Sequence, residues 1–316
     1  MSLVGALTSA ILPVLSIAAL GYVLGRVRDV EVDALSTVTI YILAPALVFH
    51  SLATTEITGD VVAALSAGVV VFVVGMALLA GAIGRLTGTS ESTHSALVLA
   101  SSFPNSGNYG IPLAAFAFGA VGRSTAVLYL AVQSILAYSV GVYIASRGTS
   151  RTNLGAVWAV FKLPLIYAVL AAGLARWFDV VPAEGSAAME TIRLTGDAAI
   201  PVMLVLLGIQ LANTTYGTEV RSVLTPTALK LVVAPVVGVG VALLFGLTGP
   251  VGRVFVLACA MPAAITPLML LIEFGEGRAE GLSGPEYVST AIFVSTVASV
   301  VTLTVLIAIL ESGLVI

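Results

Sequence analysis

The residues best suited to chemistry lie in the middle of a hydrophobic segment, where the sequence runs Pro104-Asn105-Ser106-Gly107-Asn108-Tyr109-Gly110-Ile111-Pro112. Proline lacks an amide hydrogen and clashes with the preceding turn, so we expect a helix here to break. Amides and a hydroxyl at such a position are unfavourable unless they hydrogen-bond to protein, water or a ligand. The pattern therefore predicts a binding site for a polar ligand.

The second half of the chain repeats this pattern. Leu99-Ala100-Ser101-Ser102-Phe103-Pro104 corresponds to Leu257-Ala258-Cys259-Ala260-Met261-Pro262, and a second proline follows each run, at Pro112 and Pro267. Each half-helix after a break presents unpaired amides and about half a positive charge at its N-terminus. Two such N-termini that converge predict an anion site without lysine or arginine. The predicted binding residues are Pro104, Asn105, Ser106, Asn108, Gln133, Pro262, Ala263 and Ile265.

Several polar residues have two interpretations. Asn105 and Asn108 either bind the ligand or only cap the broken helix ends. Gln133, in the next segment, either reaches the ligand or joins neighbouring helices. His50 is expected to pack at the membrane interface, and the alternatives are a proton role and a role in gating or as a counter-charge.

Two lysines and one acid complete the polar set. Lys162 and Lys230 are expected to extend to the inner membrane surface, or to act as counter-charges for an entering anion. Asp197 is expected to be hydrated or capped. The centre of the predicted bundle contains no acid, which argues against coupling through a buried carboxylate.

The composition is that of a membrane protein. Of 316 residues, 59% are hydrophobic and 9% are charged, and the mean hydropathy is +1.12. These values exclude an ordinary soluble domain and a disordered chain. Two histidines and one cysteine predict no metal site and no intrachain disulfide, and we expect no cofactor. No basic stripe is present, so nucleic acid is not an expected partner.

A spanning helix needs roughly 20 apolar residues, and the chain supplies about ten such stretches. They lie near 5–25, 35–53, 61–84, 94–119 (broken), 124–146, 154–176, 187–212, 224–246, 251–274 (broken) and 287–310. Basic residues are more numerous in the loops that follow the odd-numbered spans than in the other loops. We therefore expect these loops on the inside and both termini outside the membrane. The sequence thus predicts a multi-pass, all-α protein of the plasma (inner) membrane.

Prolines at 13, 45 and 104 have partners at 164, 201 and 262, in the same order and with similar gaps. The chain therefore divides into two five-span repeats, 1–147 and 154–316. Because five is an odd number, the second repeat must enter the membrane upside down. This predicts a 5+5 inverted repeat whose fourth and ninth spans are the two proline-broken helices.

The pattern Pro104-Asn105-x-x-x-x-Gly110-Ile111-Pro112 resembles the fourth-span motif of the auxin efflux carrier family, which includes the plant PIN proteins. The resemblance continues through Phe49-His50, Gln133 with Tyr138, Pro262-x-x-Ile265-x-Pro267 and Ser289-Thr290-Ala291-Ile292-Phe293, and covers nearly the whole chain.

The resemblance implies the crossover fold of bile-acid-type symporters, a homodimer and an elevator motion. Spans 1, 2, 6 and 7 (about 5–53 and 154–212) would form a scaffold. Spans 3–5 and 8–10 (about 61–146 and 224–310) would form the transport domain. Substrate would lie where spans four and nine cross, with Asn105 and Gln133 as contacts. One departure is Leu163-Pro164-Leu165, where plant members carry Asn-Pro-Asn.

These observations favour a carrier of small organic carboxylate anions, auxin-like or malonate- and malate-like. The first alternative is an organic-anion symporter coupled to sodium or protons. A membrane channel or sensor is a further alternative. An enzyme is not expected, because no nucleophile–base pair or metal cluster is present.

Overall fold

The computed structural model describes residues 3–55, 57–147, 160–214, 220–275 and 283–316, and in these ranges the fold is all-α. The first half contains α1 (Leu3–Ala6), η1 (Leu7–Ile11), α2 (Leu12–Val27), α3 (Val32–Val38), η2 (Thr39–Leu43), α4 (Ala44–Thr54), α5 (Gly59–Leu86), α6 (Glu91–Ser102), η3 (Ser106–Gly110), α7 (Ile111–Leu136), η4 (Ala137–Gly141) and α8 (Val142–Ala145).

The second half contains η5 (Val160–Lys162), α10 (Pro164–Trp177), α11 (Ala187–Asp197), α12 (Ala199–Asn213), η6 (Val220–Val223), α13 (Leu224–Ala228), η7 (Leu229–Val233), α14 (Ala234–Leu244), α15 (Gly249–Cys259), α16 (Thr266–Phe274) and α17 (Gly284–Glu311). No strand occurs in the described ranges, which hold one isolated antiparallel bridge, between Pro104 and Ala263.

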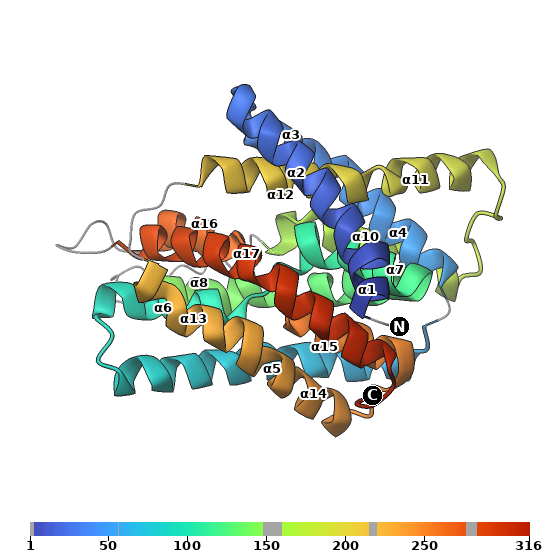
Figure 1. Ribbon diagram of the computed structural model, residues 1–316. Helices are drawn as coiled ribbons and strands as arrows, with labels where there is room; N and C mark the ends of the chain where they lie inside the picture. The colour runs from blue at the N-terminus through green and yellow to red at the C-terminus, as the bar shows by residue number, and fades with distance from the viewer. Residues whose placement is uncertain (1–2, 56, 148–159, 215–219, 276–282) are drawn as a thin grey trace.

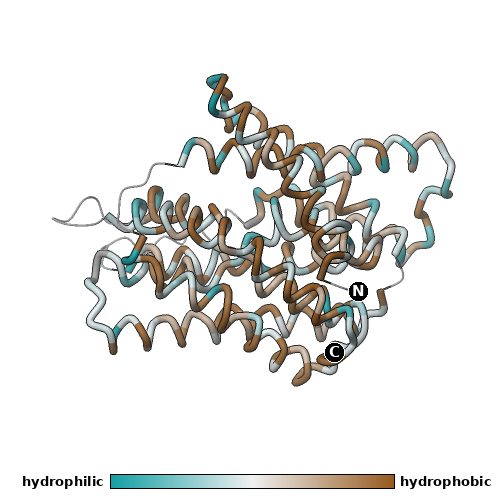
Figure 2. Tube along the Cα trace, viewed as in Figure 1, coloured by the Kyte–Doolittle hydropathy of each residue, from teal (hydrophilic) through white to brown (hydrophobic). Residues whose placement is uncertain are grey.

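Seven continuous helices in the described ranges are long and apolar enough to cross a membrane. They are Leu3–Val27, Val32–Thr54, Gly59–Leu86, Ser106–Ala145, Ala187–Asn213, Val220–Leu244 and Gly284–Glu311. Pro164–Trp177 and Gly249–Cys259 are shorter apolar helices. Hydrophobic residues dominate the helical trace, and both chain ends lie near one another at the right of the view (Figure 1, Figure 2). The protein is therefore a multi-pass membrane protein.

The longest of these helices, Ser106–Ala145, contains a kink at Gly119, where φ is 62° and ψ is −142°. A positive φ is accessible to glycine without steric strain, so the kink falls at a residue that tolerates it. The position matches the predicted boundary between the segments 94–119 and 124–146.

Most prolines do not break their helices. Pro13, Pro45, Pro112 and Pro235 each occupy the second position of an α-helix that directly follows a π-turn. A proline ring clashes with the carbonyl four residues earlier in a regular helix, and the wider π-turn relieves that clash. At Pro104 and Pro262, by contrast, the chain leaves the helical conformation for several residues in the middle of an apolar segment.

The segment α2 packs closely against α12, and Figure 1 shows the two helices next to each other at the top of the view. A Cβ atom built on Gly208 would overlap the backbone of Ala18 and Tyr22, and one built on Gly21 would overlap the backbone of Val205. Small residues allow such backbone contact between membrane helices, where the hydrophobic effect supplies little attraction.

This contact makes Gly208 a sensitive position. We expect Gly208→Ala to lower the apparent melting temperature of the detergent-purified protein, because overpacking typically destabilises by about 1–3 kcal/mol. The matched control is Gly240→Ala in α14, where a Cβ meets nothing within 4 Å. A Gly208→Ala protein that melts at or above the temperature of the control would contradict the close packing.

Candidate functional site

The two helix breaks lie against each other and satisfy each other's backbone groups. The Asn105 amide donates to the Pro262 carbonyl at 2.8 Å, and the Ala264 amide donates to the Phe103 carbonyl at 3.1 Å. The amide of Ala263, which lies between Pro262 and Ala264 in the second break, donates to the Ser295 hydroxyl of α17 at 3.1 Å. Lipid offers no partner for a freed backbone group, so the broken helices depend on this pairing.

A cavity of about 220 Å³ lies beside the paired breaks. Its walls come from the first half of the Val32–Thr54 helix, from both breaks, from the end of α7 and from the start of α10. The lining residues that carry polar side chains are Thr39, Asn105, Ser106, Asn108, Gln133, Ser134, Tyr138 and Thr266. The apolar lining residues include Leu163, Pro164, Leu165 and Met203.

Three buried side chains at the break have unused hydrogen-bonding capacity. Asn105 is 8% exposed and precedes the π-turn η3, yet its side chain forms no capping hydrogen bond. The Ser106 hydroxyl and the Gln133 Oε1 atom are buried and have no partner. Gln133 Nε2 donates to the Pro104 carbonyl at 2.9 Å. Gln133 therefore holds the break in place, and the unpaired atoms are available to a ligand.

Backbone electrostatics at the cavity favour an anion. Gly107 and Asn108 are in the first turn after one break, and Thr266 is the first residue of α16 after the other. Amides at such positions have no intrahelical acceptor, and helix N-termini carry a partial positive charge. The described residues that line the cavity include no charged side chain. The two N-termini are thus the source of positive potential there.

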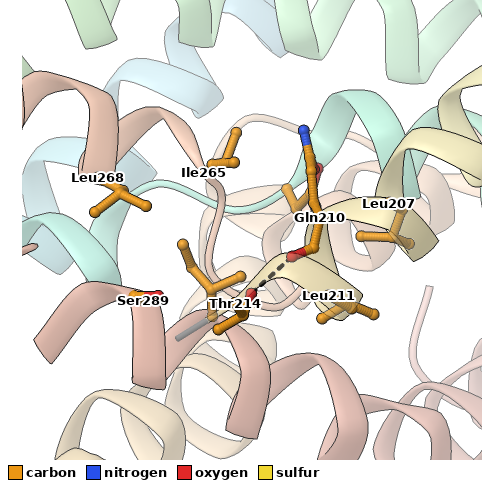
Figure 3. A pocket seen from close by; sticks show the side chains of 9 residues that line it. Leu207, Gln210, Leu211, Thr214, Ile265, Leu268 and Ser289 are labelled. Carbon is orange, nitrogen blue, oxygen red and sulfur yellow. Dashed lines mark hydrogen bonds between the residues drawn. The ribbon is translucent and has the colours of Figure 1, made fainter. Parts of the chain in front are cut away.

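A second, smaller cavity of about 30 Å³ lies next to the first, and Asn105 and Ile265 line both cavities. Figure 3 shows this smaller cavity between α12, α16 and α17, with the Gln210 side chain extending from α12 toward the segment that carries Ile265. The Thr214 hydroxyl donates to the Gln210 carbonyl at 2.8 Å. Asn105 and Ile265 are therefore shared by the two cavities.

Most of the predicted site residues come together at the larger cavity. Its lining includes Pro104, Asn105, Ser106, Asn108, Gln133 and Ile265. Pro262 and Ala263 line neither cavity, because their backbone pairs with the other break and both residues are buried. Their role is to hold the break together.

The predicted cationic and gating residues lie elsewhere. Nη2 of Arg123 donates to Nδ1 of His50 at 3.2 Å, in a cluster that does not line the cavity. Lys162 is exposed in η5 and does not line the cavity, although Leu163 does. The expectation that Lys230 extends to the membrane surface is wrong: the residue is 0% exposed, because its ammonium turns inward to backbone carbonyls.

The cluster around His50 joins α4, α7 and α11. Arg123 donates to Asp197 at 2.8 Å, and Arg193 donates to the other oxygen of Asp197 at 2.8 Å. Asp197, expected to be hydrated or capped, is therefore paired with two arginines. Close by in the sequence, the hydroxyls of Thr55 and Ser124 are 2.6 Å apart.

Comparison with known proteins identifies the family to which the chain belongs. The profile of the family described as membrane transport protein matches residues 6–154 and 154–307, and so nearly the whole chain. The chain belongs to this family, the auxin efflux carriers. An uncharacterised transporter of Methanothermobacter thermautotrophicus is 27% identical over 305 residues, which cover 94% of this chain and 96% of that protein. An uncharacterised transporter of Methanocaldococcus jannaschii is 22% identical over 269 residues, 82% of this chain and 87% of that protein.

The membrane transport family and the transporter relatives, together with the apolar helices, make this chain a membrane transporter. It works in a lipid bilayer on a small-molecule substrate. Among the residues that the structure describes, no group of three or more His, Cys, Asp and Glu side chains could hold a metal ion.

Sequence reasoning missed Thr39, Ser134, Met203 and Gln210 as lining residues, and Ser295 as a partner of the break. Tyr138 and the stretch Leu163-Pro164-Leu165 had been noted through the family motif, and they do line the cavity. In the sequence, the missed residues are recognisable only as polar or flexible side chains in apolar helices. That signal does not say which neighbouring segment the side chain faces.

The hydrogen bond from Ala263 to Ser295 is testable. We expect Ser295→Ala to destabilise the protein by about 1–3 kcal/mol, because it leaves the Ala263 amide buried without an acceptor. Ser102→Ala is the control, since that hydroxyl is also fully buried but donates to Val98 in its own helix at 2.7 Å. Thermal unfolding in detergent is the measurement, and equal melting temperatures for the two variants would contradict the role of Ser295.

Proposed function

We propose that this protein is a secondary carrier of small organic carboxylate anions, and that the anion binds in the larger cavity at the paired breaks. The observation that carries this proposal is the arrangement of two helix N-termini around one uncharged, amide-lined cavity. Such N-termini bind carboxylates and phosphates through backbone amides. Asn105 and Ser106 add side-chain donors at the same place.

The cavity walls suggest what the rest of the substrate looks like. Leu163, Pro164 and Leu165 add apolar surface to the cavity wall, which suits a carboxylate with a carbon skeleton. Gln133 Oε1 is an unpaired acceptor, so a hydroxyl or N–H group on the substrate can donate to it. Malate-like hydroxy acids and auxin-like acids both carry such a donor, and malonate does not.

The central test is a thermal-shift screen of carboxylates on purified protein, followed by transport of the hits in proteoliposomes. A true substrate raises the apparent melting temperature by mass action. We expect Asn105→Ala to lose that shift and to abolish or strongly weaken uptake, because it removes the side chain that lines both cavities.

The matched control is Asn213→Ala, which removes an exposed asparagine side chain at the end of α12. It should bind and transport like the unmodified protein. Full transport by an Asn105→Ala protein with normal melting behaviour would defeat the assignment of the site.

The helix contacts support ten spans in an inverted 5+5 repeat. In this scheme α2 of span 1 contacts α12 of span 7, and the equivalent pair, α10 of span 6 with α4 of span 2, is also in contact. Likewise α5 contacts α6 in the first half, and α14 contacts α15 in the second. A pseudo-two-fold axis in the membrane plane generates such matched pairs.

An elevator motion then follows as the proposed transport mechanism. Spans 1, 2, 6 and 7 form the scaffold, and spans 3–5 and 8–10 carry the paired breaks. The cavity lies between these two groups and is lined by residues near the beginning of span 2, the end of span 5 and the beginning of span 6. With both termini outside, these helix ends face the inside of the cell, so the proposed state is inward-facing.

The opposite end of the same interface is closed by polar contacts between the two groups. Arg123 of span 5 pairs with Asp197 of span 7, and Ser124 of span 5 contacts Thr55, which follows span 2. The Ser124 hydroxyl is also 3.0 Å from the Ser51 carbonyl. An elevator motion must break these contacts to open the outer side.

A disulfide across this contact tests the motion. In a Cys259→Ser background, we expect the double variant Thr55→Cys/Ser124→Cys to cross-link under oxidation, because the two native hydroxyls are 2.6 Å apart. Cross-linked protein in proteoliposomes should lose transport, and reduction should restore it. Each single cysteine variant, oxidised in the same way, is the control. Undiminished transport by fully cross-linked protein would contradict movement at this interface.

Three finer expectations stay predictions: a homodimer, the plasma membrane as location, and both termini outside. Mass measurement of the detergent-free complex tests the first. The symporter alternative finds little support in the described core, because none of its buried side chains is an aspartate or glutamate that could bind a coupling cation.

A further inference from the structure

Lys230 is an unusual residue in a membrane transporter. It lies in the π-turn η7 and its side chain is 0% exposed. Its ammonium is 3.4 Å from the Cys259 carbonyl and 3.5 Å from the Ser101 carbonyl, and 5.4 Å from the centre of the Phe72 ring. No salt bridge to Lys230 occurs in the described ranges. A buried ammonium that has only carbonyls and a ring as partners is expensive, so it calls for an explanation.

The two carbonyls are equivalent positions of the repeat. Ser101 and Cys259 occupy the same place in the aligned runs that end at Pro104 and Pro262. They lie in the last turns of α6 and α15, the first halves of the two broken helices. Lys230 therefore joins the C-terminal ends of both half-helices.

The break itself deprives both carbonyls of backbone donors. Three residues after each carbonyl stands a proline, which has no amide hydrogen. Four residues after each stands an amide that is bonded elsewhere: Asn105 donates to Pro262, and Ala263 donates to Ser295. Each helix C-terminus also carries about half a negative charge. The result is a buried pair of negatively polarised oxygens that have no backbone donor and can coordinate a cation.

We propose that this is a monovalent-cation site whose resident ligand is the protein's own ammonium. Lys230 neutralises the two C-terminal ends, while the N-terminal ends of the other half-helices face the cavity. Truncation of Lys230 vacates the site and leaves two carbonyls directed at it. The truncated protein then binds a small free cation such as Na⁺, K⁺ or NH₄⁺, which the unmodified protein does not need.

The test measures thermal stability of the purified full-length protein in chloride salts, without any organic anion. Sodium, potassium and ammonium chloride are compared with choline chloride at equal ionic strength, because choline is too large for the site. For Lys230→Ala we expect the melting temperature to rise by about 2 °C for each tenfold increase of the free cation concentration above its dissociation constant. The unmodified protein should show no difference between these salts.

Two further variants separate this site from general salt effects. Lys230→Met fills the space without a charge, so its stability should not depend on the cation. Lys162→Ala removes an exposed lysine and should behave like the unmodified protein. The proposal is overturned if Lys230→Ala responds equally to choline and to the small cations, if it fails to fold in all of these salts, or if the unmodified protein shows the same cation dependence. Because no transport is measured, a failure of the proposed anion function leaves this result unaffected.

Discussion

Backbone hydrogen bonding in a medium without water is the constraint on which the rest of this structure depends. Two prolines remove the regular partners of several amides and carbonyls in the middle of the bundle. The protein satisfies them by placing the two interrupted segments side by side, so that Asn105 and Pro262, and Ala264 and Phe103, exchange hydrogen bonds. Ser295 and Gln133 supply further partners from α17 and α7. Neither break could persist in lipid without the other.

The same geometry places the negative and the positive ends of the half-helices in different surroundings. The C-terminal ends of α6 and α15 meet at the Lys230 ammonium, and the N-terminal ends of the following half-helices face the cavity. Negative ends are thus next to a cation, and positive ends are next to a space for an anion. For the proposed carboxylate substrate, such a site would supply attraction without a permanent cationic side chain, which favours release as well as binding.

Around this centre the packing differs from one interface to another. The contact between α2 and α12 uses glycines to bring two backbones together, which makes that part of the bundle rigid. The interface between α7 and the helices α4 and α11 instead consists of hydroxyl contacts and ion pairs of Arg123 and Asp197. Polar contacts of this kind can separate in water at modest cost, whereas interlocked backbones cannot. This difference is what the proposed elevator motion requires of the two interfaces.

The sequence by itself determined the all-α membrane class, the positions of the two breaks and six of the residues that line the cavity. These features follow from apolar length, from the missing amide of proline and from polar residues in apolar surroundings, all of which are local. Tertiary structure alone decided that Lys230 turns inward, that His50 joins Arg123, and that Pro262 and Ala263 hold the break together instead of lining the cavity. The physical reason is that the partner of a polar group in lipid is chosen across distant segments. Local spacing shows that such a partner is required, but only the packed helices show which one it is.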